Sequence, residues 1–238
     1  GCPWDKEQTH ESLKRYLVEE SYEVLEAIDE KDDDKLAEEL GDVLLQIVFH
    51  AQIGKENGFF NINDVIEKIC IKMINRHPHV FSNINADTPE EVLTNWDKIK
   101  KKEQGLISYT DELKHVPKNL PALMRAEKVQ KKAAKVGFDW NKIEDALDKV
   151  LEEYYEVKGV YKSKEMAKIV EEIGDLIFAS VNVARFLDID PEFALNYTIE
   201  KFIKRFSYIE EVAKSKGVDM ANMTLEQMDM LWEEAKNK

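Results

Sequence analysis

Cysteine is scarce in this chain, which has only Cys2 and Cys70 among its 238 residues. Two cysteines cannot form the disulfide framework on which small secreted domains depend. Cys70 lies in an apolar helical stretch, so we expect it to be a small core residue rather than a reactive thiol. A reducing cytoplasm is the simplest setting for such a chain.

Glycine and proline are also scarce, with nine and six residues. Long stretches without either favour helix over strand, and no segment has the alternating pattern of a long strand. No apolar run approaches the roughly 20 residues that a helix needs to cross a bilayer, and no signal peptide is recognisable. The chain starts at Gly1 without a Met, so we expect further residues upstream. We predict an all-α protein that does not partner a membrane.

Positive charge is in deficit, because 48 acidic residues outnumber 34 basic ones and give a formal net charge of −14. A uniformly acidic chain repels the phosphate backbone, so duplex nucleic acid is not an expected partner. Small phosphate-bearing substrates remain compatible with this charge if a metal ion neutralises them. Hydrophobic residues make up 43% of the chain, which is enough to build a core.

Several catalytic motifs are missing as well. The sequence has no Gly-rich phosphate loop, no Walker motif and no Ser/His/Asp pattern. Its five histidines do not form the pattern of a metal site. A di-iron bundle needs two Glu-x-x-His motifs, and this chain has only Glu7-x-x-His10. If this protein handles phosphate, we expect it to do so through a metal ion held by other ligands.

What the chain does contain is a spacing of carboxylates that occurs twice. In each copy Glu-Glu-x-x-Glu is followed by Glu-x-x-Asp, and every acid of the second copy lies 133 residues after its counterpart. The first copy comprises Glu19, Glu20, Glu23, Glu39 and Asp42, and the second comprises Glu152, Glu153, Glu156, Glu172 and Asp175. Carboxylates that converge in a fold suit Mg²⁺, which prefers oxygen ligands and often binds substrate phosphates too.

This spacing has a helical explanation. Residues three or four positions apart share one helical face, so Glu20 and Glu23 point the same way, as do Glu39 and Asp42. The polar run 29–34 predicts a turn between two antiparallel helices, and 162–165 is the equivalent turn in the second copy. Glu-rich helices often do no more than solvate a surface, but recurrence of the whole pattern at one offset favours a site.

Hydrophobic periodicity predicts a series of helices. The expected ranges are 7–28, 35–55, 64–76 with Asn63 as its cap, 89–102 with Thr88 as its cap, 121–136, an acidic helix ending near 162, 164–186, 191–216, and a last helix from 224. The segments 43–49 and 176–186 carry more apolar surface than one small hairpin can cover. We therefore predict a homodimer with a mainly apolar interface.

The two copies of the pattern divide the chain into two halves that separate near residue 115. We predict two helical domains, 1–115 and 116–238. Residues 103–121, which contain Gly105, Pro117 and Pro121, are the expected linker.

Basic residues recur as well, because Lys72-x-x-x-Arg76 in the first half matches Lys201-x-x-x-Arg205 in the second. Each pair places two cations on one helical face, where Arg can bind phosphate oxygens as a fork and Lys adds a point charge. Such pairs are common on solvated helices, and only the carboxylates beside them favour a functional role. Trp96 and Trp232 are similarly open to two interpretations, stacking on a base or packing in a core.

Longer segments accompany these motifs. They are Cys-Pro-Trp-Asp-Lys-Glu-Gln-Thr at 2–9, Arg-His-Pro-His-Val-Phe at 76–81, Leu-Pro-Ala-Leu at 120–123 and Val-Gly-Phe-Asp-Trp at 136–140. Together with the carboxylates they make the chain resemble the MazG family of nucleoside triphosphate pyrophosphohydrolases, within the all-α NTP pyrophosphatase superfamily. The resemblance covers essentially the whole chain and implies a tandem repeat of helical-hairpin, four-helix-bundle-type domains.

The resemblance implies an enzyme that hydrolyses nucleoside triphosphates to the monophosphate and pyrophosphate with Mg²⁺, through water attack at the α-phosphorus. It also implies a homodimer whose bundles are completed across subunits, with the C-terminal repeat as the main catalytic unit. An alternative from another class is a non-catalytic regulator that binds metal and nucleotide. Metal-dependent release of pyrophosphate separates the two hypotheses. The sequence does not reveal the base preference.

The resemblance also assigns roles to individual residues. The implied metal ligands are Glu153, Glu156, Glu172 and Asp175, with Glu20, Glu23, Glu39 and Asp42 as their first-half counterparts. The implied nucleotide contacts are Lys149, Glu152, Lys168, Glu171, Lys201, Arg205 and Trp232. Glu152 is also our candidate general base.

The halves differ in the residues around these acids. Tyr16 stands where the second half has Lys149. Phe49 stands where the second half has Asn182. The first half therefore keeps the acids but lacks some polar neighbours, so we expect it to bind metal and to contribute less activity.

Overall fold

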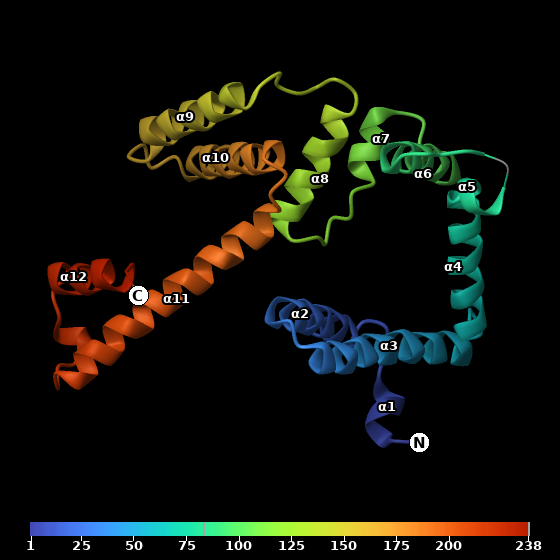
Figure 1. Cartoon of the computed structure of the whole chain (residues 1–238), viewed down its shortest axis with the longest axis horizontal. Helices are drawn as coiled ribbons and strands as arrows, with labels where there is room; N and C mark the ends of the chain where they lie inside the picture. Colours follow the sequence, from blue (N-terminus) through green and yellow to red (C-terminus); the bar gives the residue numbers. More distant parts are fainter. Residues whose placement is uncertain (83, 238) are drawn as a thin grey trace. The chain divides into compact units, whose positions relative to one another are not determined.

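The computed structural model describes residues 1–82 and 84–237, which form helices and connecting turns without a β-strand among them (Figure 1). The predicted all-α class is confirmed. The chain divides into two compact units, Gly1–Gly105 and Leu106–Lys238, and each is built on one long helical hairpin. Within the described ranges, every helix is too short or too polar to cross a membrane.

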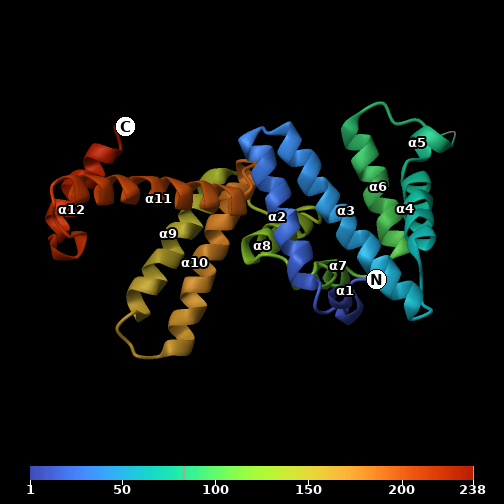
Figure 2. The ribbon, with the colours of Figure 1, turned by 90° about the horizontal axis from the view of Figure 1, so that it is seen from below.

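The first unit is built on a hairpin of two helices that pack side by side, α2 and α3 (Figures 1 and 2). Its helices are α1 (Pro3–Glu7), α2 (Lys14–Glu30), α3 (Asp33–Glu56), α4 (Ile62–Arg76), α5 (Pro78–Phe81) and α6 (Pro89–Glu103). The hairpin turn is tight because Lys31 adopts a left-handed conformation, with φ of 58°. Asp32 then caps α3 by accepting a hydrogen bond from the Lys35 backbone N–H.

The second unit repeats the hairpin with α9 and α10, which also lie side by side in both views (Figures 1 and 2). Its helices are α7 (Tyr109–Lys114), α8 (Ala122–Ala134), α9 (Ile143–Val160), α10 (Met166–Phe186), α11 (Pro191–Ser215), the 3₁₀ turn η1 (Met220–Asn222) and α12 (Leu225–Ala235). Helix α8 packs against both α10 and α11, and α12 packs back on α11.

Some predicted boundaries were wrong, for local reasons. The helix expected from residue 7 begins only at Lys14, because Thr9 and Ser12 bond each other's backbone N–H groups in a turn that competes with the helix. Helix α4 is capped by Asn61 rather than Asn63, in a capping box with Asp64. The predicted Thr88 cap of α6 is confirmed.

The segment expected to be a linker, 103–121, contains a helix. Ser108 and Asp111 form a capping box that starts α7, and α7 packs against α8. Its contacts therefore place α7 in the second unit, and the division between compact units falls after Gly105 rather than near residue 115.

Much of the apolar surface is not covered by the chain's own helices. Leu44, Leu45 and Val48 on α3 are all exposed, although their segment has the composition of a buried helix. Cys70 on α4 is exposed as well, so the expectation of a core cysteine was wrong. Sequence patterning marks which face is apolar, but not whether the same chain covers it.

Candidate metal and nucleotide site

The second-half carboxylates converge on the inner face of the α9–α10 hairpin. Glu153 and Glu156 come from α9 and Glu172 comes from α10, and each offers an oxygen within 4.8 Å of the others. Asp175 lies on α10 close to one turn after Glu172, and it lines the same cavity as Glu153. The hairpin thus brings together three of the four acids, with the fourth beside them.

Glu153 is the most informative member of this cluster, because it is only 4% exposed. Its Oε1 accepts a hydrogen bond from Lys149 Nζ at 2.6 Å, and Lys149 also donates to Glu152 Oε1 at 2.8 Å. These bonds raise the pKa of Lys149. Glu153 Oε2 is buried and accepts no hydrogen bond. A buried carboxylate oxygen without a partner is unfavourable, and a bound cation would satisfy it.

Repulsion within the cluster affects Glu156. The pKa of Glu156 is raised by hydrogen bonding to Glu153, by burial, and by the charges of Glu153 and Glu172. A divalent cation bound between these oxygens would reverse that effect, because it favours the ionised carboxylates. Oxygen-only donors are the set that Mg²⁺ or another hard cation prefers.

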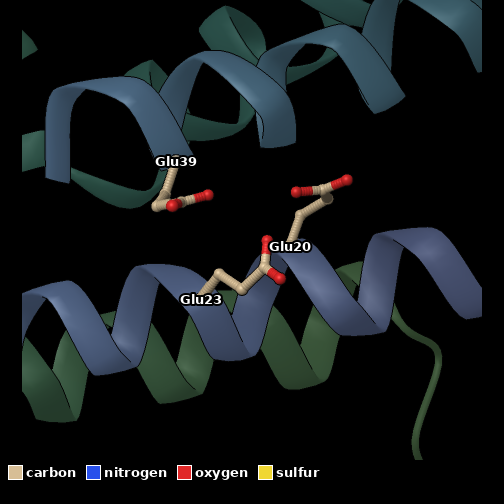
Figure 3. Close-up of side chains that lie close together, drawn as sticks. All are labelled: Glu20, Glu23 and Glu39. Carbon is tan, nitrogen blue, oxygen red and sulfur yellow. The ribbon is translucent and has the colours of Figure 1, made fainter. Parts of the chain in front are cut away.

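The first-half acids make a similar cluster on the α2–α3 hairpin. Figure 3 shows Glu20 and Glu23 on α2 and Glu39 on α3, with their carboxylates turned into the space between the helices, and ligand oxygens lie within 4.8 Å of one another. Burial raises the pKa of Glu20, with further contributions from Asp42 and Glu23. Burial also raises the pKa of Glu39, followed by the charge of Glu23. Asp42 is therefore close enough to act electrostatically on this cluster.

Aromatic rings stand in the first half at positions where the second half has polar residues. Trp4 makes edge contacts with Tyr16 and with Phe49, at centroid distances of 6.0 and 6.4 Å. Tyr16 and Phe49 stand at the positions of Lys149 and Asn182 in the other half. The polar neighbours of the second site are thus replaced by a packed aromatic group.

The remaining predicted residues fall into two groups. Lys168 and Glu171 lie exposed near the start of α10, the helix that also supplies Glu172. Lys201, Arg205 and Trp232 lie on α11 and α12, where the Arg205 guanidinium sits 5.4 Å from the centroid of the Trp232 ring.

The group on α11 and α12 is separate from the carboxylates within one chain. In the described residues, no hydrogen bond, ion pair or ring contact joins it to the acids of α9 and α10. Figure 1 shows α11 leading away from that hairpin and carrying α12 near its far end.

Sequence reasoning missed several residues beside the second site. A cavity of about 660 Å³ has Lys149, Glu153 and Asp175 in its lining. The same cavity is lined by further side chains that carried no predicted role, Gln130, Phe138, Asp139, Trp140 and Arg185. The segment 136–140 was visible as a motif, but its convergence with α8 and α10 depends on long-range packing.

Comparisons with known proteins identify the family of this chain. The family described as MazG nucleotide pyrophosphohydrolase domain matches residues 8–81 and 141–209, one match on each hairpin. The Nucleoside triphosphate pyrophosphohydrolase of Escherichia coli (strain K12) is 45% identical over 100% of this chain and 91% of its own length. The Nucleoside triphosphate pyrophosphohydrolase/pyrophosphatase MazG of Thermotoga maritima is 46% identical over 99% of this chain and 89% of its own length.

A third relative is longer than this chain. The Uncharacterized protein YabN of Bacillus subtilis (strain 168) is 56% identical over 99% of this chain, which spans only 48% of that relative. The chain therefore spans about half the length of one curated relative and most of the length of the other two.

Proposed function

This chain belongs to the MazG nucleotide pyrophosphohydrolase family, and from that premise we propose that it is an enzyme that hydrolyses nucleoside triphosphates to the monophosphate and pyrophosphate. The observation that carries the proposal is the buried, unpartnered Oε2 of Glu153, which lies in a cluster with Glu156 and Glu172. Two full-length relatives bear the name of this activity. We propose the cytoplasm as its setting, since Cys2 and Cys70 are both free thiols.

Mg²⁺ is the cofactor that the donor set fits best. Glu153, Glu156, Glu172 and Asp175 would hold the ion through carboxylate oxygens. When bound, the ion would lower the pKa of water and neutralise charge on phosphate oxygens. The first-half acids Glu20, Glu23, Glu39 and Asp42 would hold a second ion with no substrate beside it.

The chain's own residues would then orient the reactants. A water oxygen attacks the α-phosphorus, the bond from that phosphorus to the bridging oxygen of the β-phosphate breaks, and pyrophosphate leaves. Glu152 is positioned by its hydrogen bond from Lys149 and would accept the proton of the attacking water. Lys168 and Glu171 on the same hairpin would contact the nucleotide.

Charge that develops on the leaving pyrophosphate would be stabilised by Lys201 and Arg205, with Trp232 beside them. Because these residues lie apart from the carboxylates of their own chain, we propose that the protein is a homodimer in which α11 and α12 of one protomer complete the site of the other. Exposed apolar residues of α2 and α3, such as Leu25, Leu44 and Leu45, would be covered in the same assembly.

The dimer makes a direct prediction about mass. Multi-angle light scattering at micromolar concentration should give twice the chain mass of 27.7 kDa. A dimer that persists at this concentration is expected of an obligate, mainly apolar interface. A monomeric mass would exclude sites shared between protomers.

The reaction itself is tested by running it in ¹⁸O-labelled water with ATP, with excess Mg²⁺ or with EDTA. We expect pyrophosphate release only with Mg²⁺, and the label only in the monophosphate, because attack occurs at the α-phosphorus. Label in pyrophosphate would place the attack at the β-phosphorus. Binding of Mg²⁺ and nucleotide without any pyrophosphate release would favour the regulator hypothesis instead.

A further inference from the structure

The two hairpins end in turns of opposite charge. Residues 25–35, which include the turn between α2 and α3, hold six acids and two lysines. The corresponding residues 158–168, which include the turn between α9 and α10, hold four lysines and one acid. These four lysines, here called the lysine tip, are Lys158, Lys162, Lys164 and Lys168. Such a local excess of positive charge is unusual in a chain whose net charge is −14.

The charge of the lysine tip is not neutralised by the chain itself. All four lysines are exposed, and within the described ranges none of them forms an ion pair with a carboxylate. In the first hairpin, by contrast, Lys35 is held by Glu26 and Glu30. The second hairpin therefore presents free positive charge to solvent at the position where the first presents acids.

Helix stability does not explain this arrangement. Cations are favourable near a helix C-terminus, so Lys158 suits the end of α9. Lys164 and Lys168, however, lie at the start of α10, where the helix dipole disfavours a cation. The first turn of α10 has no acid, whereas α3 has Asp33 and Asp34 in its first turn. Charges that break a local rule of helix stability indicate a functional role.

The lysine tip lies close to the second-half carboxylates along the hairpin. A helix rises about 1.5 Å per residue, so Lys168 is roughly 6 Å along α10 from Glu172, and Lys158 is about 3 Å along α9 from Glu156. Figures 1 and 2 both show the turn between α9 and α10 as the free end of this hairpin. The axial separations are smaller than the Debye length of about 8 Å at physiological ionic strength. The potential of the tip therefore extends to the carboxylates.

A triphosphate that approaches this site meets opposing fields. It carries several negative charges, and both the net charge of the chain and the clustered acids repel it until a metal ion neutralises them. Repulsion slows association, whereas a patch of opposite charge beside a site raises the rate of association. Lysines next to the acids, on the free end of the same hairpin, would offset the repulsion along the path of approach.

We propose that the lysine tip is an electrostatic guide, which draws the polyphosphate chain of the substrate towards the carboxylates of α9 and α10 and so speeds its association. Lys168 is also an implied nucleotide contact, and the other three lysines act before the nucleotide is bound. The acidic turn of the first hairpin repels the same ligand. This inference rests on the proposed function, because it takes the ligand to be a nucleoside triphosphate.

The test changes the three lysines that are not implied contacts. The Gln variant combines Lys158→Gln, Lys162→Gln and Lys164→Gln. An Arg variant replaces the same three residues by Arg and keeps their charge. A matched control alters three exposed lysines of the first unit, with Lys55→Gln, Lys98→Gln and Lys102→Gln. The loss of three positive charges takes the net charge from −14 to −17 in the Gln variant and in the control alike.

Association is measured by stopped flow with a fluorescent derivative of α,β-methylene ATP, which cannot be cleaved at the α-phosphorus, and excess Mg²⁺. At an ionic strength of about 10 mM, where the Debye length is about 30 Å, we expect the Gln variant to associate about tenfold more slowly than wild type. At about 1 M, where the Debye length is about 3 Å, the two rates should converge. The Arg variant and the control should match wild type, and dissociation rates should not change.

Three results would overturn the guide. The first is equal association of the Gln variant and wild type at low ionic strength. The second is a loss that persists at about 1 M salt, or that the Arg variant shares, because the lysines would then act through contact or structure rather than through their charge. The third is an equal loss in the control, which would assign the effect to net charge.

Failure of the proposed function gives a different result. Wild-type protein would then release no pyrophosphate from ATP at any ionic strength, while association of the analogue would still test the guide. If both proposals hold, the Gln variant should have a raised KM for ATP at low ionic strength and an unchanged kcat. Wild-type protein that does not bind the analogue would reject the guide together with the function.

Discussion

The α2–α3 and α9–α10 hairpins hold the same acids at the same helical positions, but the cations around them are engaged differently. In the first half Lys35 donates to Glu26 and Glu30 at 2.8 and 2.9 Å, and these bonds raise its pKa. Its counterpart Lys168 makes no ion pair within the described ranges and is exposed. The charge of Lys35 is thus already paired with carboxylates, whereas Lys168 remains available to a ligand.

The repeated Arg–Trp pair differs in the same way. Arg76 lies 5.1 Å from the Trp96 ring centroid, as Arg205 lies 5.4 Å from that of Trp232. However, Arg76 also donates twice to Glu103, at 2.9 and 2.6 Å, and is buried. Arg205 has no carboxylate partner in the part of the chain that the structure describes. An arginine that is already paired has less to offer a phosphate.

A repeated set of carboxylates therefore does not by itself repeat the whole site. Both clusters bring carboxylate oxygens together, but Glu153 and Asp175 of the second also line a cavity with polar walls. Two cations of the second half, Lys168 and Arg205, form no ion pair among the described residues. We infer that the acids are needed in either half, and that the difference in activity between the halves depends on their neighbours, which are not the same.

Among the residues that differ between the two halves, the largest effect should come from exchanging Lys149 and Tyr16. Lys149→Tyr removes the hydrogen bonds that orient Glu152 and Glu153. Because Glu153 is a proposed metal ligand, losing the residue that orients it should lower kcat/KM by roughly ten- to a hundredfold. The reciprocal Tyr16→Lys should leave pyrophosphate release near the wild-type rate. A loss of activity in Tyr16→Lys as large as in Lys149→Tyr would show that both halves contribute.

Stability should respond next, in the first half alone. Glu103→Gln leaves the buried Arg76 without a charged partner, and breaking a buried pair destabilises by about 3 kcal/mol. Urea unfolding followed by Trp fluorescence would register this. The control Glu233→Gln breaks an exposed pair with Lys236, for which less than about 1 kcal/mol is expected. If Glu103→Gln raised activity instead, the ion pair would be what silences the first half.

A smaller difference should appear in pH dependence. His10 and His50 share a hydrogen bond between their Nδ1 atoms at 2.8 Å, and burial, followed by the charge of His10, lowers the pKa of His50. The folded state therefore disfavours the protonated ring, so the stabilisation is full above about pH 6.5, the unfolded pKa, and is lost as the pH falls below it. Val183 replaces this residue in the second half.

Thermal unfolding between pH 5 and 8 would check this prediction. We expect the first unit of the wild-type protein to lose stability on acidification, and His50→Gln to reduce that loss. A pH dependence that is unchanged by His50→Gln would assign the effect to other groups.

The hairpins could be predicted from the sequence because their determinants are local. Carboxylates at spacings of three fall on one helical face whatever surrounds them, and caps such as Thr88 act within one turn. The recurrence of the carboxylates at one offset also predicted that the hairpin occurs twice. These signals operate over a few residues, so a single sequence carries them in full.

Other features could not be predicted, because they depend on contacts between distant segments. Arg76 meets Glu103 across 27 residues, and Gln130 meets Phe178 across 48. Neither pair leaves a periodic trace in the sequence. The exposure of Cys70 was not predicted for a related reason. An apolar helix face indicates that the face is buried, but not whether the same chain or another chain packs against it.

Three single variants test whether the second hairpin carries catalysis. Glu172→Ala, Asp175→Ala and Glu39→Ala are assayed for pyrophosphate release with one triphosphate and excess Mg²⁺, with folding checked by circular dichroism. We expect intact folds, because removing one clustered acid relieves repulsion. Glu172→Ala and Asp175→Ala should lose most activity, about a thousandfold for several kcal/mol of transition-state stabilisation, and Glu39→Ala should lose much less. An inactive Glu39→Ala beside a nearly normal Glu172→Ala would contradict catalysis by the second hairpin, and three variants equal to wild type would reject metal-dependent catalysis at either cluster.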